Sequence, residues 1–400
     1  MLDGESTFVS IIQMLQFPDY RPFASLVEYP RMDGPARVRL RDLSVRDESE
    51  REDLREILER FIEHGQWIMG EEVEKFEADI ASFFKRKHCV SVASASSGLY
   101  LALKALGVGE GDEVITTPMS WLVTSSAVVL TGATPVFVDV DENYNLDPDA
   151  IQAAITHRTK AILPVHFYGR VAQISRIAEI AKRRGLSLVE DVAQAVGGHV
   201  DGVFAGSFGD VGVMSFSPMK ILAGIGDAGA IICDDDELAQ NLRVLRHCGT
   251  VRGEICIAPE LKHNIDALNA AVIRRRLRFL NETIEFRRGK ALLYQENLEG
   301  VVACPDPGKD GMHTFFDYTI RTSYRDELIR HLFQERIEVK IRHPLLICDQ
   351  PIYSHLPRPE VPRAREFVRE ILCLPLHTNI SDVEVRLVAK QTRLLLSERS

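Results

Sequence analysis

From residue 89 onward, short apolar segments alternate with longer segments of helical character, and this alternation limits the fold more than any other feature of the sequence. Strands that alternate with helices are typical of a mainly parallel sheet covered by helices on both faces. The predicted strands cover residues 89–93, 113–117, 135–139, 161–165, 187–191, 211–216 and 230–233, and the clearest helices between them cover 172–184 and 237–246. The sequence therefore predicts an α/β fold with a mixed, mainly parallel sheet, in which ligands bind at the carboxyl ends of the strands.

The segments on either side of this core also carry helical patterns. A charged stretch at 47–63 predicts a surface helix, and a long helical segment at 266–298 leads to a last region of mixed strands and helices. Spacings of three and four predict one buried face for the helix that follows Gly70, formed by Val73, Phe76, Ile80 and Phe83.

The length of 400 residues exceeds what one hydrophobic core usually supports. We predict an N-terminal extension at 1–38, a large domain at 39–275 and a smaller C-terminal α+β domain at 276–400. Whether the first helices of the large domain pack on the small one is left open. So is the state of the extension, which is consistent with an arm on the fold or with a poorly ordered tail.

Composition excludes several classes of partner. The net charge of −10 argues against nucleic acid or an anionic membrane surface as the main partner. The seven cysteines are widely spaced without a Cys-x-x-Cys pair, which is typical of reduced thiols. The chain starts without a signal-peptide pattern and contains no apolar run of membrane-spanning length. We therefore expect a cytoplasmic protein with neither a disulfide framework nor a metal site.

Lys220 is the first candidate for chemistry. Most lysines are solvated surface charges, but the residues from Val211 to Ile232 are apolar or small, interrupted mainly by Asp227. A buried ammonium without a partner is costly, so its pKa falls or the amine is used covalently. A lysine with a depressed pKa is suited to forming an imine with an aldehyde.

Asp191 ends a predicted strand in the segment 189–194. An aspartate there can simply cap the following helix, which on its own is at least as common. It can also face the protonated nitrogen of a pyridine ring in a cleft at the strand ends.

Two further strand ends carry candidate binding groups. The small residues Ser94 to Gly98 precede a helix, where free backbone N–H groups make either a phosphate seat or an ordinary serine cap. Trp121 follows another predicted strand, where it either belongs to the core or stacks on a planar cofactor.

The segment Gly224 to Gly229 spells Gly-x-Gly-x-x-Gly, which elsewhere marks dinucleotide binding. That fingerprint should follow a strand and open a helix, whereas here it leads into the strand-like residues 230–233. We interpret it as a flexible glycine-rich turn beside Lys220. His166 also ends a strand, and we expect a structural, hydrogen-bonded histidine more than a ligand contact.

The order of these segments resembles one family, the DegT/StrS group of sugar aminotransferases, which are fold type I enzymes dependent on pyridoxal 5′-phosphate (PLP). The resemblance extends from about Gly70 to the end of the chain. It rests on the segments 111–115, 132–139, 165–169, 190–194, 206–210, 215–220 and 374–377.

The resemblance implies transfer of an amino group from an amino acid, commonly glutamate, to a keto-sugar, a nucleotide-linked keto-sugar or a cyclitol ketone, by a ping-pong mechanism through pyridoxamine phosphate. Lys220 would hold PLP as a Schiff base and move protons. Asp191 would pair with the ring nitrogen, Gln194 would contact the ring hydroxyl, and Trp121 would stack on the ring.

The same resemblance implies that Ser215, with the turn at Ala95 and Ser96, holds the phosphate. Asn264 would reach the phosphate site of a neighbouring subunit, so a homodimer with shared active sites is implied. The family usually has Gly-Thr at Ala95-Ser96 and Gly-Gly at Ala228-Gly229, and it has a glycine and an aromatic residue before Asn264 that this chain lacks.

Two other functions stay open. PLP- or pyridoxamine-dependent sugar dehydratases resemble this family but carry histidine at the lysine position, so Lys220 favours amino transfer. A PLP-binding regulator on a retained fold is the other alternative. The sequence identifies neither the acceptor nor any role for Arg252, Arg342 and His343.

Overall fold

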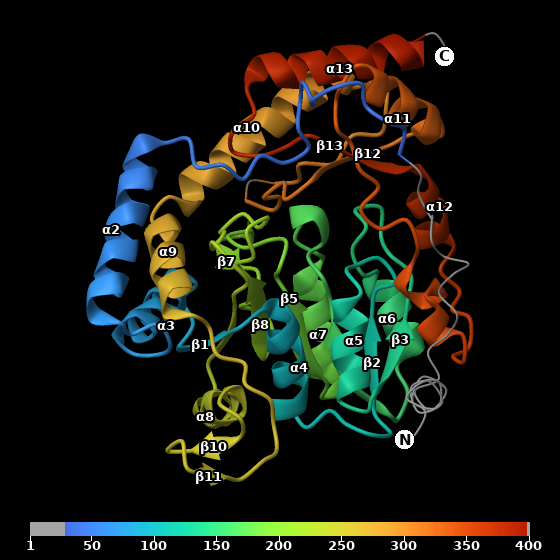
Figure 1. Ribbon diagram of the computed structural model, residues 1–400. Helices are drawn as coiled ribbons and strands as arrows, with labels where there is room; N and C mark the ends of the chain where they lie inside the picture. The colour runs from blue at the N-terminus through green and yellow to red at the C-terminus, as the bar shows by residue number, and fades with distance from the viewer. Residues whose placement is uncertain (1–28, 310, 398–400) are drawn as a thin grey trace, which may run out of the picture.

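The computed structural model describes residues 29–309 and 311–397, and its centre is a seven-stranded sheet (Figure 1). The strand order is β1-β9-β8-β5-β4-β2-β3. Strands β8, β5, β4, β2 and β3 run parallel, and β9 is antiparallel to both of its neighbours. The strands are β1 (His88–Val92), β2 (Glu113–Thr116), β3 (Thr134–Phe137), β4 (Thr159–Leu163), β5 (Ser187–Asp191), β8 (Val211–Ser215) and β9 (Gly229–Cys233). The predicted α/β class and all seven predicted strands are confirmed.

The two faces of the sheet bury separate apolar clusters because successive strand residues point to opposite sides. In β5, Leu188 belongs to one cluster and Val189 to the other, and Ile232 and Ile231 of β9 divide in the same way. Strands buried on both faces appear as continuous apolar runs, which is the pattern that the sequence showed.

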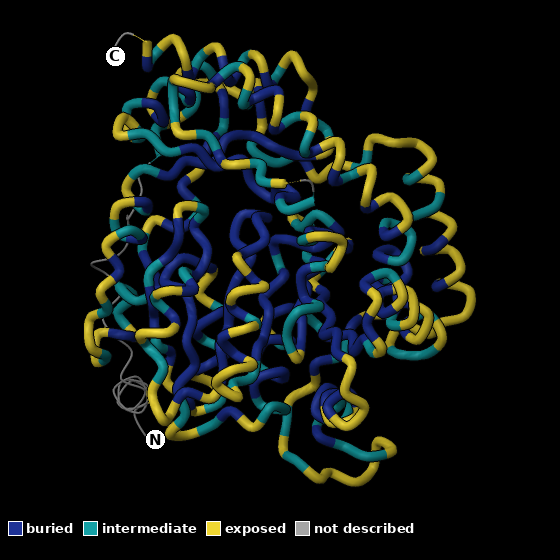
Figure 2. Tube along the Cα trace, turned by 180° about the vertical axis from the view of Figure 1, so that it is seen from behind, coloured by how far each residue is buried: buried dark blue, intermediate teal, exposed yellow. Residues whose placement is uncertain are grey.

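Helices cover both faces. One face carries α4 (Ala95–Ala105), α5 (Val123–Leu130) and α8 (Asp236–Arg246). The other carries α3 (Glu71–Phe83), α6 (Pro148–Ala154), α7 (Ile174–Arg184) and α9 (Ala267–Leu277). Figure 2 shows the sheet strands almost entirely buried beneath this cover.

The segment predicted as one helix at 266–298 forms two, α9 and α10 (Leu280–Leu298). The break lies at Arg278 and Phe279. Neither residue is a proline or a glycine, so the sequence contains no signal that ends a helix there. Helix α2 (Glu48–His64) agrees with the predicted surface helix, and it buries only Ile57 and Phe61.

The C-terminal region has a core of its own. The antiparallel strands β12 (Tyr318–Arg321) and β13 (Ile371–Leu374) pack with α10, α11 (Arg325–Gln334) and α13 (Asp382–Ser397). Of the predicted extension, residues 1–28 lie outside the described part. Tyr29 and Val38 pack on this C-terminal core, and the Tyr29 hydroxyl accepts from the amide of Ile341 at 2.8 Å. The domain boundaries at 38 and 275 stay predictions.

The remaining short elements lie in the connections. These are η2 (Phe167–Gly169), β6 (His199–Val200), β7 (Val203–Phe204), β10 (Thr250–Val251), β11 (Ile255–Cys256), η3 (Ile347–Asp349), η4 (Pro351–Tyr353) and α12 (Pro362–Glu370). The hairpin β10–β11 projects beyond α8, away from the rest of the molecule (Figure 1). Within the described ranges, no helix is long and apolar enough to cross a membrane.

Candidate active site at the strand ends

Lys220 lies in the turn that follows β8. Its amide nitrogen donates to the carbonyl of Ser217 at 2.9 Å, and its Nζ stands 4.7 Å from the centre of the Phe316 ring. Burial lowers the pKa of Lys220, Asp191 opposes that fall and the nearby Arg342 adds to it, and together these effects bring the pKa to about 8. The amine therefore combines a fixed position with access to its neutral form.

Asp191 ends β5 in the same region and is only 4% exposed. Its carboxylate accepts from the hydroxyl of Thr124 at 3.2 Å and from the amide of Ala193 at 3.0 Å. Burial raises the pKa of Asp191, and these two hydrogen bonds and the charge of Lys220 oppose that rise. The site thus holds a buried carboxylate within the electrostatic range of an amine.

Gln194 lies three residues after Asp191, in the loop that follows β5. Its side-chain oxygen accepts from the amide of Tyr168 at 2.9 Å, which fixes the orientation of the side-chain amide. Tyr168 adopts a left-handed backbone conformation with φ of 53°. The loop after β4 therefore positions a residue that the loop after β5 supplies.

A corner rich in small residues forms at the start of α4. The hydroxyl of Ser94 caps the helix by accepting from the amide of Ser97 at 3.2 Å, and the first turn begins at Ala95 and Ser96. A Cβ on Gly229 would lie 2.7 Å from the nitrogen of Ala95, so only glycine allows β9 to approach this closely. Gly229 pairs with Ser215 in the sheet, which brings that serine to the same corner. The N-terminus of a helix attracts anions, so the corner suits a phosphate.

Trp121 lies beyond the end of β2 with 59% of its surface exposed, and its ring centre is 6.1 Å from that of His343. An exposed indole at the strand ends leaves a large apolar face available to a planar ligand. Asn264 lies elsewhere: its side-chain nitrogen is 3.1 Å from Nδ1 of His247, and its buried side-chain oxygen has no hydrogen-bond partner within the described ranges.

His166 is a structural residue, as expected. Its Nδ1 accepts from the amide of Ala172 at 3.1 Å, so the ring proton resides on Nε2, which faces Glu190 at 3.1 Å. The glycine-rich turn differs from expectation. It leads into β9, which excludes the dinucleotide geometry, but side chains of α9 hold it by hydrogen bonds, so it is not a freely flexible turn.

A cation-rich cluster beside Lys220 was missed from sequence. Asp317 accepts hydrogen bonds from both Arg41 and Arg342, and the two guanidinium carbons lie 4.8 and 5.3 Å from the Phe316 ring centre. The guanidinium groups of two arginines therefore lie beside the same Phe316 ring that faces Lys220. These residues come from distant parts of the chain, and no local motif marks any of them. Arg252, by contrast, follows β10 in the projecting hairpin.

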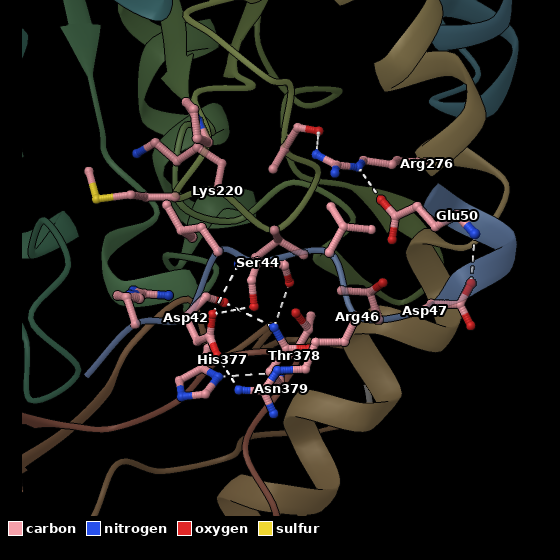
Figure 3. Close-up of a pocket in the computed structure, with 18 of the residues that line it drawn as sticks. Asp42, Ser44, Arg46, Asp47, Glu50, Lys220, Arg276, His377, Thr378 and Asn379 are labelled. Atoms are coloured by element: carbon pink, nitrogen blue, oxygen red, sulfur yellow. Dashed lines mark hydrogen bonds and ion pairs between the residues drawn. The ribbon is translucent and has the colours of Figure 1, made fainter. Parts of the chain in front are cut away.

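A cavity of about 270 Å³ borders the Lys220 turn on the side of α2 and α10 (Figure 3). It is lined mainly by polar and charged residues, including Asp42, Ser44, Arg276 and Asn379. Asp191, Gln194 and Ser215 do not line it. Of the candidate cofactor residues only Lys220 reaches this cavity, so it is a neighbouring space and not the cofactor seat.

Comparison with known proteins agrees with the geometry. A family model described as the DegT/DnrJ/EryC1/StrS aminotransferase family matches residues 48–393. The chain is 37% identical over 345 residues to the dTDP-3-amino-3,4,6-trideoxy-alpha-D-glucose transaminase of Streptomyces venezuelae, covering 85% of this chain and 91% of that protein. It is 36% identical over 368 residues to a protein of Geobacillus stearothermophilus named pleiotropic regulatory protein, covering 88% and 97%.

The fold is similar to that of a solved structure, S. venezuelae DesV in complex with a ketimine intermediate. The TM-score is 0.87 at 35% sequence identity, and the match covers 91% of this chain and 99% of that one.

Proposed function

Because the chain belongs to the DegT/DnrJ/EryC1/StrS aminotransferase family, whose cofactor is PLP, we propose that it transfers an amino group from an amino acid to a keto-sugar. PLP supplies an aldehyde that forms imines with amines and a ring that takes up electrons from the bond being broken. The observation that carries the proposal is that Lys220 and Asp191 lie at the same strand ends, where the charge of each acts on the other. One is an amine with a pKa of about 8, and the other is a buried carboxylate in its electrostatic range.

The residues present fit the cofactor. Lys220 would hold PLP covalently through Nζ, and Asp191 would accept a hydrogen bond from the protonated ring nitrogen. Gln194 would contact the ring hydroxyl, and Trp121 would cover one ring face. Ser215 and the first amides of α4, at Ala95 and Ser96, would bind the phosphate at the corner that the close approach of Gly229 forms.

Lys220 would also move the proton. When it is not bound to the cofactor, the neutral Nζ of Lys220 would take a proton from the substrate carbon that bears the amino group and would hold it as an ammonium, the acid that later returns it. A lysine with an ordinary pKa would be almost fully protonated at neutral pH and would serve poorly as this base. The lowered pKa of Lys220 therefore supports the dual role.

The charges around Lys220 support a carboxylate-bearing donor, and we propose glutamate. Arg41 and Arg342 share the single carboxylate of Asp317, so the cluster with Lys220 has a net positive charge. We propose a ping-pong mechanism, in which the donor leaves its amine on the cofactor as pyridoxamine phosphate before the acceptor binds.

For the acceptor we propose a nucleotide-linked keto-sugar. The support is that several relatives are named as transaminases of such sugars, including the S. venezuelae protein above and a UDP-N-acetyl-3-dehydro-alpha-D-glucosamine 3-aminotransferase of Acidithiobacillus ferrooxidans.

We also propose a homodimer with shared active sites. The projecting hairpin exposes Ile255 by 62% and Ile257 by 63%, and Leu261 beside it is 73% exposed. Exposed apolar patches of this kind are typical of interfaces. In such a dimer Asn264, three residues after Leu261, would extend toward the phosphate site of the second copy.

The test compares Lys220→Ala with Lys182→Ala, an exposed lysine on α7. Borohydride reduction of the PLP-loaded wild type and of the Lys182 variant should attach the cofactor to the peptide containing Lys220, as read by mass spectrometry. The Lys220 variant should bind PLP only reversibly and lose turnover. Amine incorporation into keto-sugars, rather than loss of water, should accompany activity. Full turnover by the Lys220 variant would exclude the assignment.

A further inference from the structure

The loop that carries Lys220 is closed on itself. The amide of Gly224 donates to the carbonyl of Phe216 at 2.6 Å, and within this loop the amide of Lys220 donates to Ser217 at 2.9 Å. Residues 216–224 thus form one compact loop between the end of β8 and the glycine-rich turn. A displacement of the segment at 223–224 would therefore act on the loop that carries Lys220.

Helix α9 holds this loop and the turn from one side. The Arg276 guanidinium donates to the carbonyl oxygens of Ala223 and Gly224 at 2.8 and 3.2 Å. Two turns earlier on the helix, Asn269 accepts from the amide of Ile225 at 2.9 Å and donates to the carbonyl of Asp227 at 3.0 Å. Two side chains of α9 thus hold four of the five residues from Ala223 to Asp227, at the end of the lysine loop and the start of the glycine-rich turn.

Glycine is required where the helix meets the turn. A Cβ at Gly224 would lie 2.2 Å from the side-chain oxygen of Asn269, so any larger residue would displace the Asn269 side chain from its hydrogen bonds. This contact gives Gly224, the first glycine of the turn, a purpose unrelated to nucleotide binding. It allows α9 to approach the backbone.

Arg276 is itself anchored from outside. Its Nε donates to Glu50 of α2 at 2.8 Å, as Figure 3 shows. The two preceding residues are also arginines, but Arg275 pairs with Asp53, and Arg274 pairs with Glu72 and Asp79. Among these three arginines, only Arg276 contacts the lysine loop.

We propose that Arg276 and Asn269 are positioning residues for Lys220, and that Glu50 acts through Arg276. This inference rests on the proposed function, because the hydrogen bonds of Arg276 and Asn269 have this purpose only if Lys220 is the reactive amine. Catalytic groups lose rate steeply when displaced by about 1 Å. The Arg276 guanidinium donates to two carbonyl oxygens of the loop and to none of the residues proposed to hold the cofactor, so it would act through the position of Lys220.

The first experiment uses the protein without added cofactor. Hydrogen–deuterium exchange in peptides covering 216–229 is compared for wild type, Arg276→Gln and the matched control Arg275→Gln. We expect the amides of Lys220, Gly224 and Ile225 to exchange about tenfold faster in the Arg276 variant, with the control unchanged. Equal exchange in the two variants would overturn the proposal.

The second experiment uses the PLP-loaded enzyme. We expect kcat to fall about tenfold in Arg276→Gln while the KM of each substrate stays within about twofold, and Arg276→Lys to recover part of the loss. If Arg276→Gln does not fold, Glu50→Gln replaces it, since that change removes only the outer anchor, and the same comparison is made. A loss confined to KM would also contradict the proposal.

Failure of the proposed function would look different. If borohydride attaches no cofactor to wild-type Lys220, the aminotransferase assignment fails. The exchange comparison would still report whether α9 holds the loop.

Discussion

His166 and Glu190 face one another at 3.1 Å, and neither side chain is exposed to solvent. Glu190 also accepts from three backbone amides of the following turn, those of Gly206 at 2.8 Å and of Phe208 and Gly209 at 2.7 Å. Four donors therefore converge on one buried carboxylate. Since Asp191 is the next residue, this network fixes the strand end on which the candidate site is built.

Replacing Glu190 by glutamine should destabilise the protein. The glutamine nitrogen would face N–H donors that now bond to carboxylate oxygens, and buried hydrogen bonds to charged groups contribute about 1.5–3 kcal/mol each. We expect the free energy of unfolding to fall by about 3 kcal/mol, measured by urea denaturation. Glu59→Gln, an exposed change on α2, is the control. Equal stability of the two variants would show that the network has no such effect.

The amine of Lys220 should titrate well below other lysines. Burial lowers its pKa to about 8, so at pH 7 about one molecule in ten has the neutral amine, against far fewer for a surface lysine of pKa about 10.4. In the cofactor-free protein, modification of Lys220 by an amine reagent should increase as the pH rises through about 8. Peptide mass spectrometry measures this, with exposed Lys182 as the internal reference. A midpoint for Lys220 equal to that of Lys182 would contradict the prediction.

Local patterns in the sequence predicted the strands and the residues at their ends. Asp191 and Lys220 stood out because each lies within or beside a continuous apolar run, and such runs predict buried strands. The cluster of Arg41, Phe316 and Asp317 gave no such signal, because Arg41 meets Asp317 across 276 residues of chain. In a sequence, an arginine that pairs inside a protein resembles one on its surface.

The break between α9 and α10 was missed for a similar reason. Arg278 and Phe279 carry no proline or glycine signal, and tertiary packing decides where α9 stops. Asn269 and Arg276 share a face of α9 seven residues apart, but only the fold shows that this face meets the turn after Lys220.

Thr124→Val should lower the activity of the enzyme without disturbing its fold. The hydroxyl of Thr124 donates to the Asp191 carboxylate at 3.2 Å, which favours the charged form. This hydrogen bond opposes the effect of burial, so its loss should raise the pKa of Asp191 further. The acidic limb of the pH profile of kcat/KM should therefore move to higher pH, and kcat should fall about three- to tenfold.

The matched control is Ser126→Ala on the same helix, since the Ser126 hydroxyl donates to the backbone carbonyl of Leu122 rather than to Asp191. It should leave the pH profile unchanged. If the acidic limb does not shift in the Thr124 variant, the Thr124 hydroxyl does not affect the ionisation that limits activity at low pH.

Asp317→Asn tests the cation cluster. Asp317 is 2% exposed and is the carboxylate shared by Arg41 and Arg342, so neutralising it leaves two arginines without their charge partner. Breaking a buried ion pair from one side costs about 3–5 kcal/mol, and we expect a loss of this size in urea denaturation. Asp306→Asn is the control. Its carboxylate is 59% exposed and pairs with Arg170 at 3.0 Å, so the loss should stay below about 1 kcal/mol.

The same variant should also change the reactive amine. The charge of Asp317 raises the pKa of Lys220 and opposes the effects of burial and of Arg342. Without it, the pH midpoint for modification of Lys220 should fall below that of the wild type, and the Asp306 control should not move. A midpoint that does not fall in Asp317→Asn would mean that the charges of this cluster do not act on Lys220, and the proposed role of the cluster in attracting an anionic donor would lose its support.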